Sequence, residues 1–194
     1  FEGLLAHCPS VSAFTRSTRS SEVVRYGQDI IPDANLIGIE PSWHDIERRA
    51  IVQGRPFSMI DSDNGRSVCL VTGKVIDALR LPRECVGQSI LVGNQAFLII
   101  GVVEDRAESS MFGGGGSDKE IFLPFKSLWR MMGRWGFMYA MAASRGPELS
   151  EDARAELRFF MRQTRHRRAE QEDDRIDRIL IQGGAAPKPA RHEI

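Results

Sequence analysis

Three acidic side chains, an Asn-Gly pair and a Gly-Lys step lie within residues 57–79. Such a stretch is compatible with a calcium loop, a pair of catalytic acids or a simple turn. A calcium loop that begins at Asp61 needs glycine at its sixth position and glutamate at its twelfth. The chain has Arg66 and Thr72 at these positions, so the ligand pattern fails. We therefore predict that Asp61 and Asp63 are solvated residues of a turn, and we expect no bound metal.

The Gly73-Lys74 step also fails as a phosphate-binding loop. That motif requires Ser or Thr after the lysine and a glycine five residues before Gly73, whereas this chain has Val75 and Val68. Asn64-Gly65 is instead a strong turn signal, and the apolar run 68–71 predicts a buried strand. The stretch is predicted to form a turn, a strand and a helix.

No sequence pattern for nucleophilic catalysis is complete. Residues 87–91 begin like the serine elbow of hydrolases, but they lack its second glycine and open a strand. Cys8 follows His7 directly, but a catalytic pair is brought together by the fold and not by adjacency. The four histidines, at positions 7, 44, 166 and 192, contain no i, i+4 pair. We expect them at surface or partly satisfied positions, and we expect no catalytic residue and no cofactor.

The 194 residues carry 26 basic and 26 acidic side chains. This length suffices for one large domain or two small ones, and the zero net charge gives no support for a nucleic-acid partner. Cys8, Cys69 and Cys85 match no zinc spacing and leave at least one thiol unpaired within the chain. Cys69 is expected to act as a small buried hydrophobe. The state of the three thiols stays open.

Apolar stretches such as residues 96–103 are far shorter than the roughly 20 residues of a membrane-spanning helix. Residues 1–8 lack the basic start and apolar core of a signal peptide. The fragment is therefore expected to be soluble, which holds equally for a soluble part of a membrane protein.

Predicted strands and helices follow one another along the chain. Strands are predicted over residues 11–15, 22–26, 36–39, 68–71, 89–92, 96–103, 121–123, 137–143 and 177–182. Helices are predicted to begin near Ser42, Gly73, Pro124 and Ser150, with Ser42 and Ser150 as N-caps. Two hairpins are expected, one turning at residues 16–21 and one at Gly93-Asn94. The order indicates an α+β fold with mixed strand pairing.

Residues 104–119 form a long polar connection with four consecutive glycines at 113–116. Glycine loses more backbone entropy on ordering than any other residue, so the connection is expected to be mobile. Met111 and Phe112 precede the glycines, and large apolar side chains on a mobile loop gain little unless a partner covers them. We predict that Met111 and Phe112 contact a partner; the alternative is an idle flexible loop.

The motifs together resemble the MacB-like periplasmic core domain of ABC transporter permeases. The resemblance begins at Gly54-Arg55-Pro56-Phe57, the acidic turn and the strand ending at Gly73, and it covers roughly residues 5–182. The further matching segments are 85–90 with Gly87, 93–97 with Gly93 and Phe97, 100–103 with Gly101, 121–124 with Pro124, and 157–181. The chain departs from the family pattern at Cys85, where proline is usual, and at residues 177–179, where an aromatic residue is usual.

The resemblance implies a porter-like α/β subdomain interrupted by a mostly β (Sabre-like) insertion. The porter-like part would comprise residues 1–55 and 127–182, the insertion 56–126, and a linker or tail 183–194. The residues implied to set the fold, without a catalytic role, are Gly54, Arg55, Phe57, Gly73, Gly87, Gly93, Phe97, Gly101 and Pro124.

The resemblance also implies a position outside the cytoplasmic membrane, as the periplasmic domain of an inner-membrane permease. ATP-driven motion would be relayed to it to export or extract a substrate. The implied partners are the transmembrane helices of the same permease, a cytoplasmic ATPase domain or subunit, a second permease copy, and a periplasmic adaptor or substrate protein. Lipoprotein, peptide, antibiotic and lipid exporters share the domain, so the cargo stays open. The alternative is a free-standing soluble binding module with no membrane context.

Overall fold

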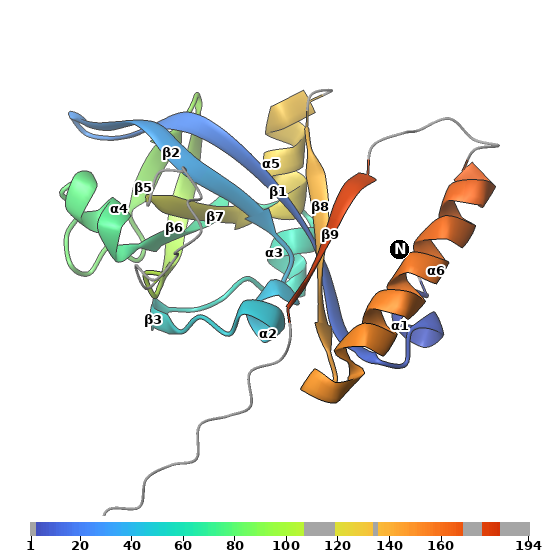
Figure 1. Cartoon of the computed structure of the whole chain (residues 1–194). Coiled ribbons are helices and arrows are strands. Elements are labelled where there is room, and N and C mark those ends of the chain that lie inside the picture. The colour runs from blue at the N-terminus through green and yellow to red at the C-terminus, as the bar shows by residue number, and fades with distance from the viewer. Residues whose placement is uncertain (1–2, 107–118, 134–135, 169–175, 183–194) are drawn as a thin grey trace, which may run out of the picture.

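A computed structural model describes residues 3–106, 119–133, 136–168 and 176–182, with side chains up to Gln163 (Figure 1). The helices are α1 (Leu4–His7), α2 (Trp43–Glu47), α3 (Met59–Asp63), α4 (Gly73–Ala78), α5 (Phe125–Met132), the short 3-10 helix η2 (Pro147–Leu149) and α6 (Ser150–Arg168). The strands are β1 (Val11–Tyr26), β2 (Asp29–Ile39), β3 (Ile51–Gly54), β4 (Val68–Thr72), β5 (Ser89–Val92), β6 (Gln95–Val103), β7 (Glu120–Pro124), β8 (Met138–Ser144) and β9 (Ile176–Gln182). This is the predicted α+β class.

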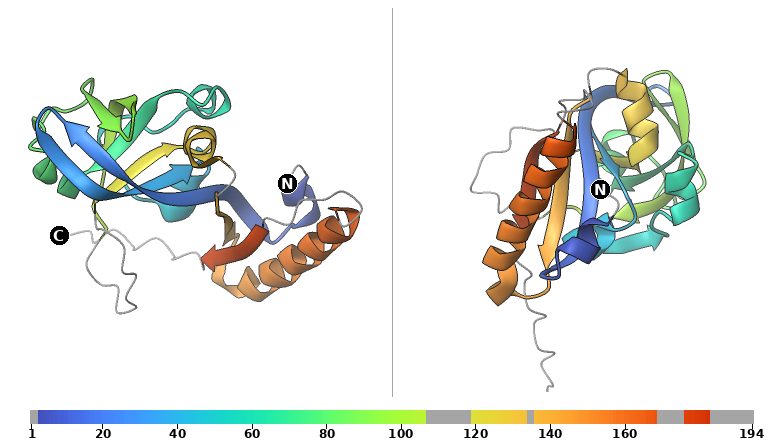
Figure 2. Two further views of the ribbon diagram at one scale, coloured as in Figure 1. Left: turned by 90° about the horizontal axis from the view of Figure 1, so that it is seen from above. Right: turned by 90° about the vertical axis from the view of Figure 1, so that its right-hand side faces the viewer.

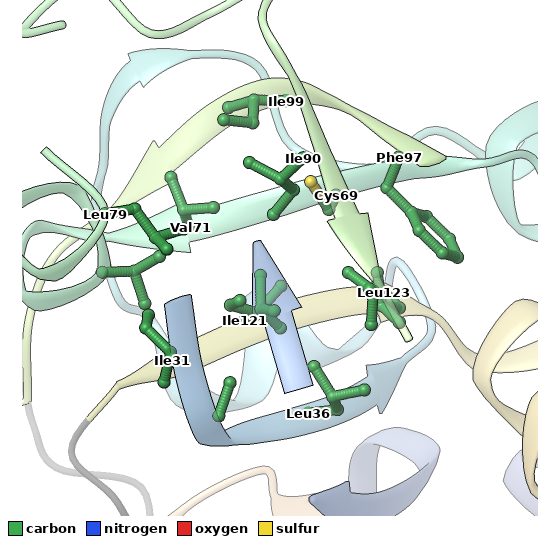
Figure 3. Close-up of a cluster of buried hydrophobic side chains, with 14 of the residues drawn as sticks. Ile31, Leu36, Cys69, Val71, Leu79, Ile90, Phe97, Ile99, Ile121 and Leu123 are labelled. Atoms are coloured by element: carbon green, nitrogen blue, oxygen red, sulfur yellow. The ribbon is translucent and has the colours of Figure 1, made fainter. Parts of the chain in front are cut away.

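Six of the strands close into a ring. β1 pairs with β2, β2 with β7, β7 with β4, β4 with β6, β6 with β5, and β5 again with β1. The ring encloses apolar side chains that include Phe97, Ile90, Ile121 and Leu36 (Figure 3). A ring of this size leaves space for packed side chains and no channel, so the interior is a hydrophobic core.

The 16-residue strand β1 extends beyond the ring. Its first half pairs with β8, and β9 adds to β8 in parallel. Helices α1 and α6 lie beside this extension (Figure 2). Leu4 and Cys8 pack there with Ala142, Ala153 and Leu157, and all five are buried. Ala153 and Leu157 therefore form the inner face of α6.

Helix α2 packs between the ring and β8. Trp43 and Ile46 of α2 belong to one buried cluster with Phe122 of β7 and with Tyr139 and Met141 of β8. The outer surface of the ring and the extension of β1 therefore share a second hydrophobic core around α2.

The predicted turn at residues 16–21 is wrong, because these residues lie inside β1. The hairpin turns later, at Gly27, which has φ +56°. Ser17 and Thr18 are tolerated at buried positions of β1 because their hydroxyl groups are satisfied: Ser17 Oγ donates to Gly38 O at 2.9 Å and Thr18 Oγ1 to Phe137 O at 2.6 Å.

The two predicted N-caps differ from the structure. Ser42 precedes α2, but its Oγ donates to Phe14 O at 2.9 Å and makes no cap hydrogen bond. Ser150 is itself the first residue of α6, which continues directly from η2. Both helices begin where predicted; tertiary contacts and the preceding 3-10 turn replace the local caps.

The hydrogen-bonded ring crosses the boundaries implied by the family resemblance. It combines β1 and β2, which lie within residues 1–55, with four strands from residues 56–126. The division into a porter-like part and an insertion stays a prediction.

Candidate functional site: the motif around Arg55 and Asp61

Gly54 and Gly101 bring β3 and β6 unusually close together. They are paired residues of the antiparallel ladder. A Cβ atom on Gly54, which has φ +75°, would lie 2.2 Å from Ile100 O, and a Cβ on Gly101 would lie 2.7 Å from Arg55 O. Because any side chain would collide with backbone atoms there, glycine is required on both strands.

The chain leaves this pair through Arg55, whose side chain binds a buried carboxylate. Arg55 Nη1 lies 2.6 Å from Asp61 Oδ2 and Nη2 lies 3.4 Å from Oδ1. Ser58 N and Ser58 Oγ donate to the same Oδ2 at 2.9 and 2.7 Å, and Asp61 N donates back to Ser58 Oγ at 3.2 Å. Ser58 and Asp61 thus form a capping box that starts α3.

The prediction that Asp61 is a solvated turn residue is wrong. Its side chain is 1% exposed, whereas that of Asp63 is 63% exposed, as predicted. Burial on its own raises the pKa of Asp61, but the hydrogen bonds from Arg55 and Ser58 outweigh burial and hold that pKa well below its usual range. The spacing Ser58-x-x-Asp61 is the sequence signal that predicts this cap.

The Arg55–Asp61 pair is suited to anchoring the backbone. Asp61 stays ionised and already accepts several hydrogen bonds, so it is a poor proton acceptor for catalysis. Within the part of the chain that the structure describes, no group of three or more His, Cys, Asp or Glu side chains is placed to hold a metal ion.

The other motif residues lie at separate points of the fold. Gly73 is the first residue of α4, where a Cβ would lie 2.4 Å from Asp105 Oδ2, and Phe97 is fully buried in the ring. Gly87 N donates to Ile99 O and Gly93 N to Val23 O, both at 2.8 Å. Pro124 ends β7 and precedes α5.

Only part of the predicted set comes together in space. Gly54, Arg55 and Gly101 are direct neighbours, and Phe57 is buried in the cluster around α2. Met111 and Phe112 lie outside the described residues, so their predicted partner contact stays a prediction.

The cysteine and histidine side chains do not form a reactive centre in the described residues. Cys8, Cys69 and Cys85 are buried free thiols, as predicted for Cys69, and burial raises the pKa of each. His7 Nδ1 lies 2.8 Å from Gly3 O. Both ring nitrogens of His44 are buried without a hydrogen-bond partner, and burial lowers its pKa. His44 itself is of intermediate exposure, and what sequence reasoning missed is that its two ring nitrogens are buried.

An open groove of about 870 Å³ lies between β3 and α4. Val52, Gln53, Ile76 and Arg80 contribute to its lining, and Gly73 lies at its edge. No Ser, Thr, Cys or His is among the described lining residues, so the groove offers no nucleophile with a neighbouring base. None of the described helices is long and apolar enough to cross a membrane.

Two sequence relatives are much longer proteins. The macrolide export ATP-binding/permease protein MacB from Hahella chejuensis is 29% identical over 134 residues, which is 66% of this chain and 19% of that protein. The pyoverdine export ATP-binding/permease protein PvdT from Pseudomonas syringae pv. syringae is 27% identical over 164 residues, which is 84% of this chain and 24% of that protein. The chain therefore spans about a fifth of the length of these curated relatives.

Two solved structures share the fold. The periplasmic region of MacB from Actinobacillus actinomycetemcomitans has a TM-score of 0.55 at 22% identity, covering 65% of this chain and 54% of that chain. The extracellular domain of the noncanonic ABC-type transporter YknZ from Gram-positive bacteria has a TM-score of 0.61 at 20% identity, covering 78% and 74%. The family described as the MacB-like periplasmic core domain matches residues 2–158, most of the chain, and the chain belongs to that family.

Proposed function

We propose that this chain is the extracytoplasmic domain of a MacB-type ABC transporter permease. It is not a catalyst itself; it relays ATP-driven motion to export or extract a substrate across the cell envelope. The observation that carries the proposal is the family match over residues 2–158. The anchoring role of the Arg55–Asp61 pair agrees with a mechanical part, because a domain that transmits force needs rigidly held segments, and the pair fixes the chain after β3 to α3.

The proposed partners follow from the same family. They are transmembrane helices of the same protein, an ATPase domain or subunit in the cytoplasm, and a second permease copy. Met111 and Phe112 are proposed to contact a periplasmic adaptor or the second permease copy, and a substrate protein is a further proposed partner. Macrolides and pyoverdine are the first cargoes to test, because proteins named for their export are relatives of this chain.

The relay is proposed to run through β1. This strand pairs with β8 at one end and with β2 and β5 in the ring at the other. A continuous hydrogen-bonded strand is stiff along its length, so displacement of the β8 side would reach the ring through it.

Labelling of the full-length protein in intact spheroplasts tests the proposed location. Glu151 is 82% exposed, so Glu151→Cys offers an accessible thiol, whereas Cys8, Cys69 and Cys85 are buried. A membrane-impermeant maleimide should label the variant without lysis. Labelling only after lysis would contradict the proposal, and so would the absence of apolar runs of about 20 residues on both sides of the domain in the full gene product. Either outcome would favour the free-standing binding module.

Transport measurements test the activity. Cells that lack the full-length protein should become more susceptible to macrolides or secrete less pyoverdine, and the wild-type gene should restore the phenotype. If several cargo classes are unaffected while the domain is extracytoplasmic, the export role is contradicted for those classes and the location stands.

A further inference from the structure

Arg49 lies in the short link between α2 and β3, and its side chain is only 9% exposed. Its Nη1 contacts Glu120 Oε2 at 2.6 Å, and Glu120 is 11% exposed. Its Nε and Nη2 donate to Glu104 O at 3.0 and 2.5 Å. One guanidinium therefore binds the residue that follows β6 and the residue that begins β7.

Aromatic rings and backbone bonds hold this guanidinium in place. Its central carbon lies 5.1 Å from the ring centre of Phe122 and 5.9 Å from that of Trp43. Next to it, Glu104 N donates to Ala50 O at 2.9 Å. Arginine suits this site better than lysine, because only the planar fork can bind a carboxylate and a carbonyl at once while stacking on rings.

The link that contains Arg49 continues directly from α2, and α2 contacts β8. Trp43 and Ile46 share a buried cluster with Tyr139 and Met141, and α2 packs on both β1 and β8. Arg49 therefore connects a helix seated against β8 to two strand ends of the ring. It forms a second connection between these parts, alongside β1.

We propose that Arg49 is a positioning residue that couples α2 to the ends of β6 and β7, so that displacement of β8 reaches the ring at these two ends. The inference rests on the proposed relay of motion. A substitution at Arg49 should therefore lower transport while the protein still folds and hydrolyses ATP.

The test compares Arg49→Lys with wild type in the full-length permease. Lysine keeps the charge next to Glu120 but loses the fork, so the variant should fold and hydrolyse ATP. The transport per ATP hydrolysed should fall by about 5- to 150-fold, the usual range of coupling between sites. Arg130→Lys is the control: the Arg130 guanidinium of α5 also donates to backbone carbonyls, those of Lys126 and Gly65, at 3.2 and 2.7 Å, but Arg130 lies outside β1 and does not bind the ends of β6 and β7. It should leave the ratio unchanged.

The outcomes separate the two proposals. If Arg49→Lys lowers only the melting temperature or the amount of protein, while transport per ATP is normal, Arg49 has a structural role and the inference is overturned. An equal loss of the ratio in Arg130→Lys would overturn it as well. If the wild-type protein moves no cargo in response to ATP, the proposed function itself fails. Glu120→Gln provides a second variant: combined with Arg49→Lys, it should cause no further loss if the two residues act as one unit.

Discussion

Gly54 and Gly101 lie opposite each other where β3 pairs with β6, and neither has room for a Cβ atom. The obstacle in both cases is backbone: Ile100 O for Gly54, and Arg55 O for Gly101. The close approach sets the direction in which the chain leaves β3 toward Arg55 and α3.

Alanine at these positions should destabilise the domain to different extents. Gly101→Ala is expected to lower the free energy of unfolding by about 1–3 kcal/mol, because it overpacks a tight contact. Gly54→Ala should cost about 1–2 kcal/mol more, because its φ of +75° also disfavours a side chain. Gly87→Ala is the control, since Gly87 has φ +92° but open space around it, and should show the conformational cost alone. Denaturant unfolding measures all three, and equal losses would refute the steric argument.

Asp61→Asn should reduce the acid sensitivity of the fold. The folded-state pKa of Asp61 is lowered, so the unfolded chain binds more protons in acid and the stabilisation is present above about pH 4–5. It is lost as the pH falls below that value. At neutral pH the substitution should cost about 2–3 kcal/mol through loss of the cap and the charged hydrogen bonds. Between pH 5 and pH 2, about the titration range of a carboxyl group, stability should decline less steeply in the variant. Asp63→Asn, at an exposed position, should follow the wild type.

Calcium should not stabilise the domain. Asp61 is already bound by Arg55 and Ser58, and the closing glutamate of a calcium loop is replaced by Thr72. Thermal unfolding curves with and without millimolar calcium should therefore coincide. A ligand that binds only the folded state must raise the melting temperature, so a clear upward shift would mean that a site exists.

The native thiols should be unreactive in the folded protein. Cys8, Cys69 and Cys85 are fully buried, and burial raises the pKa of each thiol, so neither access nor thiolate is available at neutral pH. Maleimide labelling should appear only on unfolding in denaturant, while Glu151→Cys should label at once in the native state. Rapid native labelling at Cys85 would show that the segment before β5 opens.

Deletion of Met111–Ser117 should reduce transport without reducing the stability of the domain. If these residues contact a partner, the melting temperature of the domain should hardly change while transport by the full-length protein falls. Burial of Met111 and Phe112 against a partner would contribute about 1.5–3 kcal/mol each. A lower melting temperature would place the segment in the core, and normal transport would favour an idle loop.

Local patterns in the sequence predicted the elements that are defined by local chemistry. The apolar run of β4, the Gly93-Asn94 hairpin and the helix after Pro124 each depend on a few neighbouring residues. The ring depends on pairings such as β2 with β7 and β4 with β6, whose partners are distant in sequence, and no periodicity specifies these.

The site was predictable to a lesser degree. Gly54, Arg55 and Gly101 were identified through the family motif, and the capping spacing of Ser58 and Asp61 was present but was interpreted as part of a turn. Arg49 has no signal in the sequence, because one of two adjacent arginines in a short link looks like a solvated residue until Glu104 and Glu120 are brought to it. The polar residues 16–21 misled for the same reason: their hydrogen-bond partners come from other strands.

The long strand β1 has a consequence for how the domain folds and unfolds. Its residues 11–18 pair with β8, which lies far along the sequence at residues 138–144, and its residues 24–25 close the ring against β5. Neither part has a complete sheet without this one strand, so the two parts are expected to melt together in a single cooperative transition. β1 and β8 are far apart in the sequence, so their pairing requires the closure of a long loop. Such non-local contacts give a high contact order, and we therefore expect this domain to fold slowly.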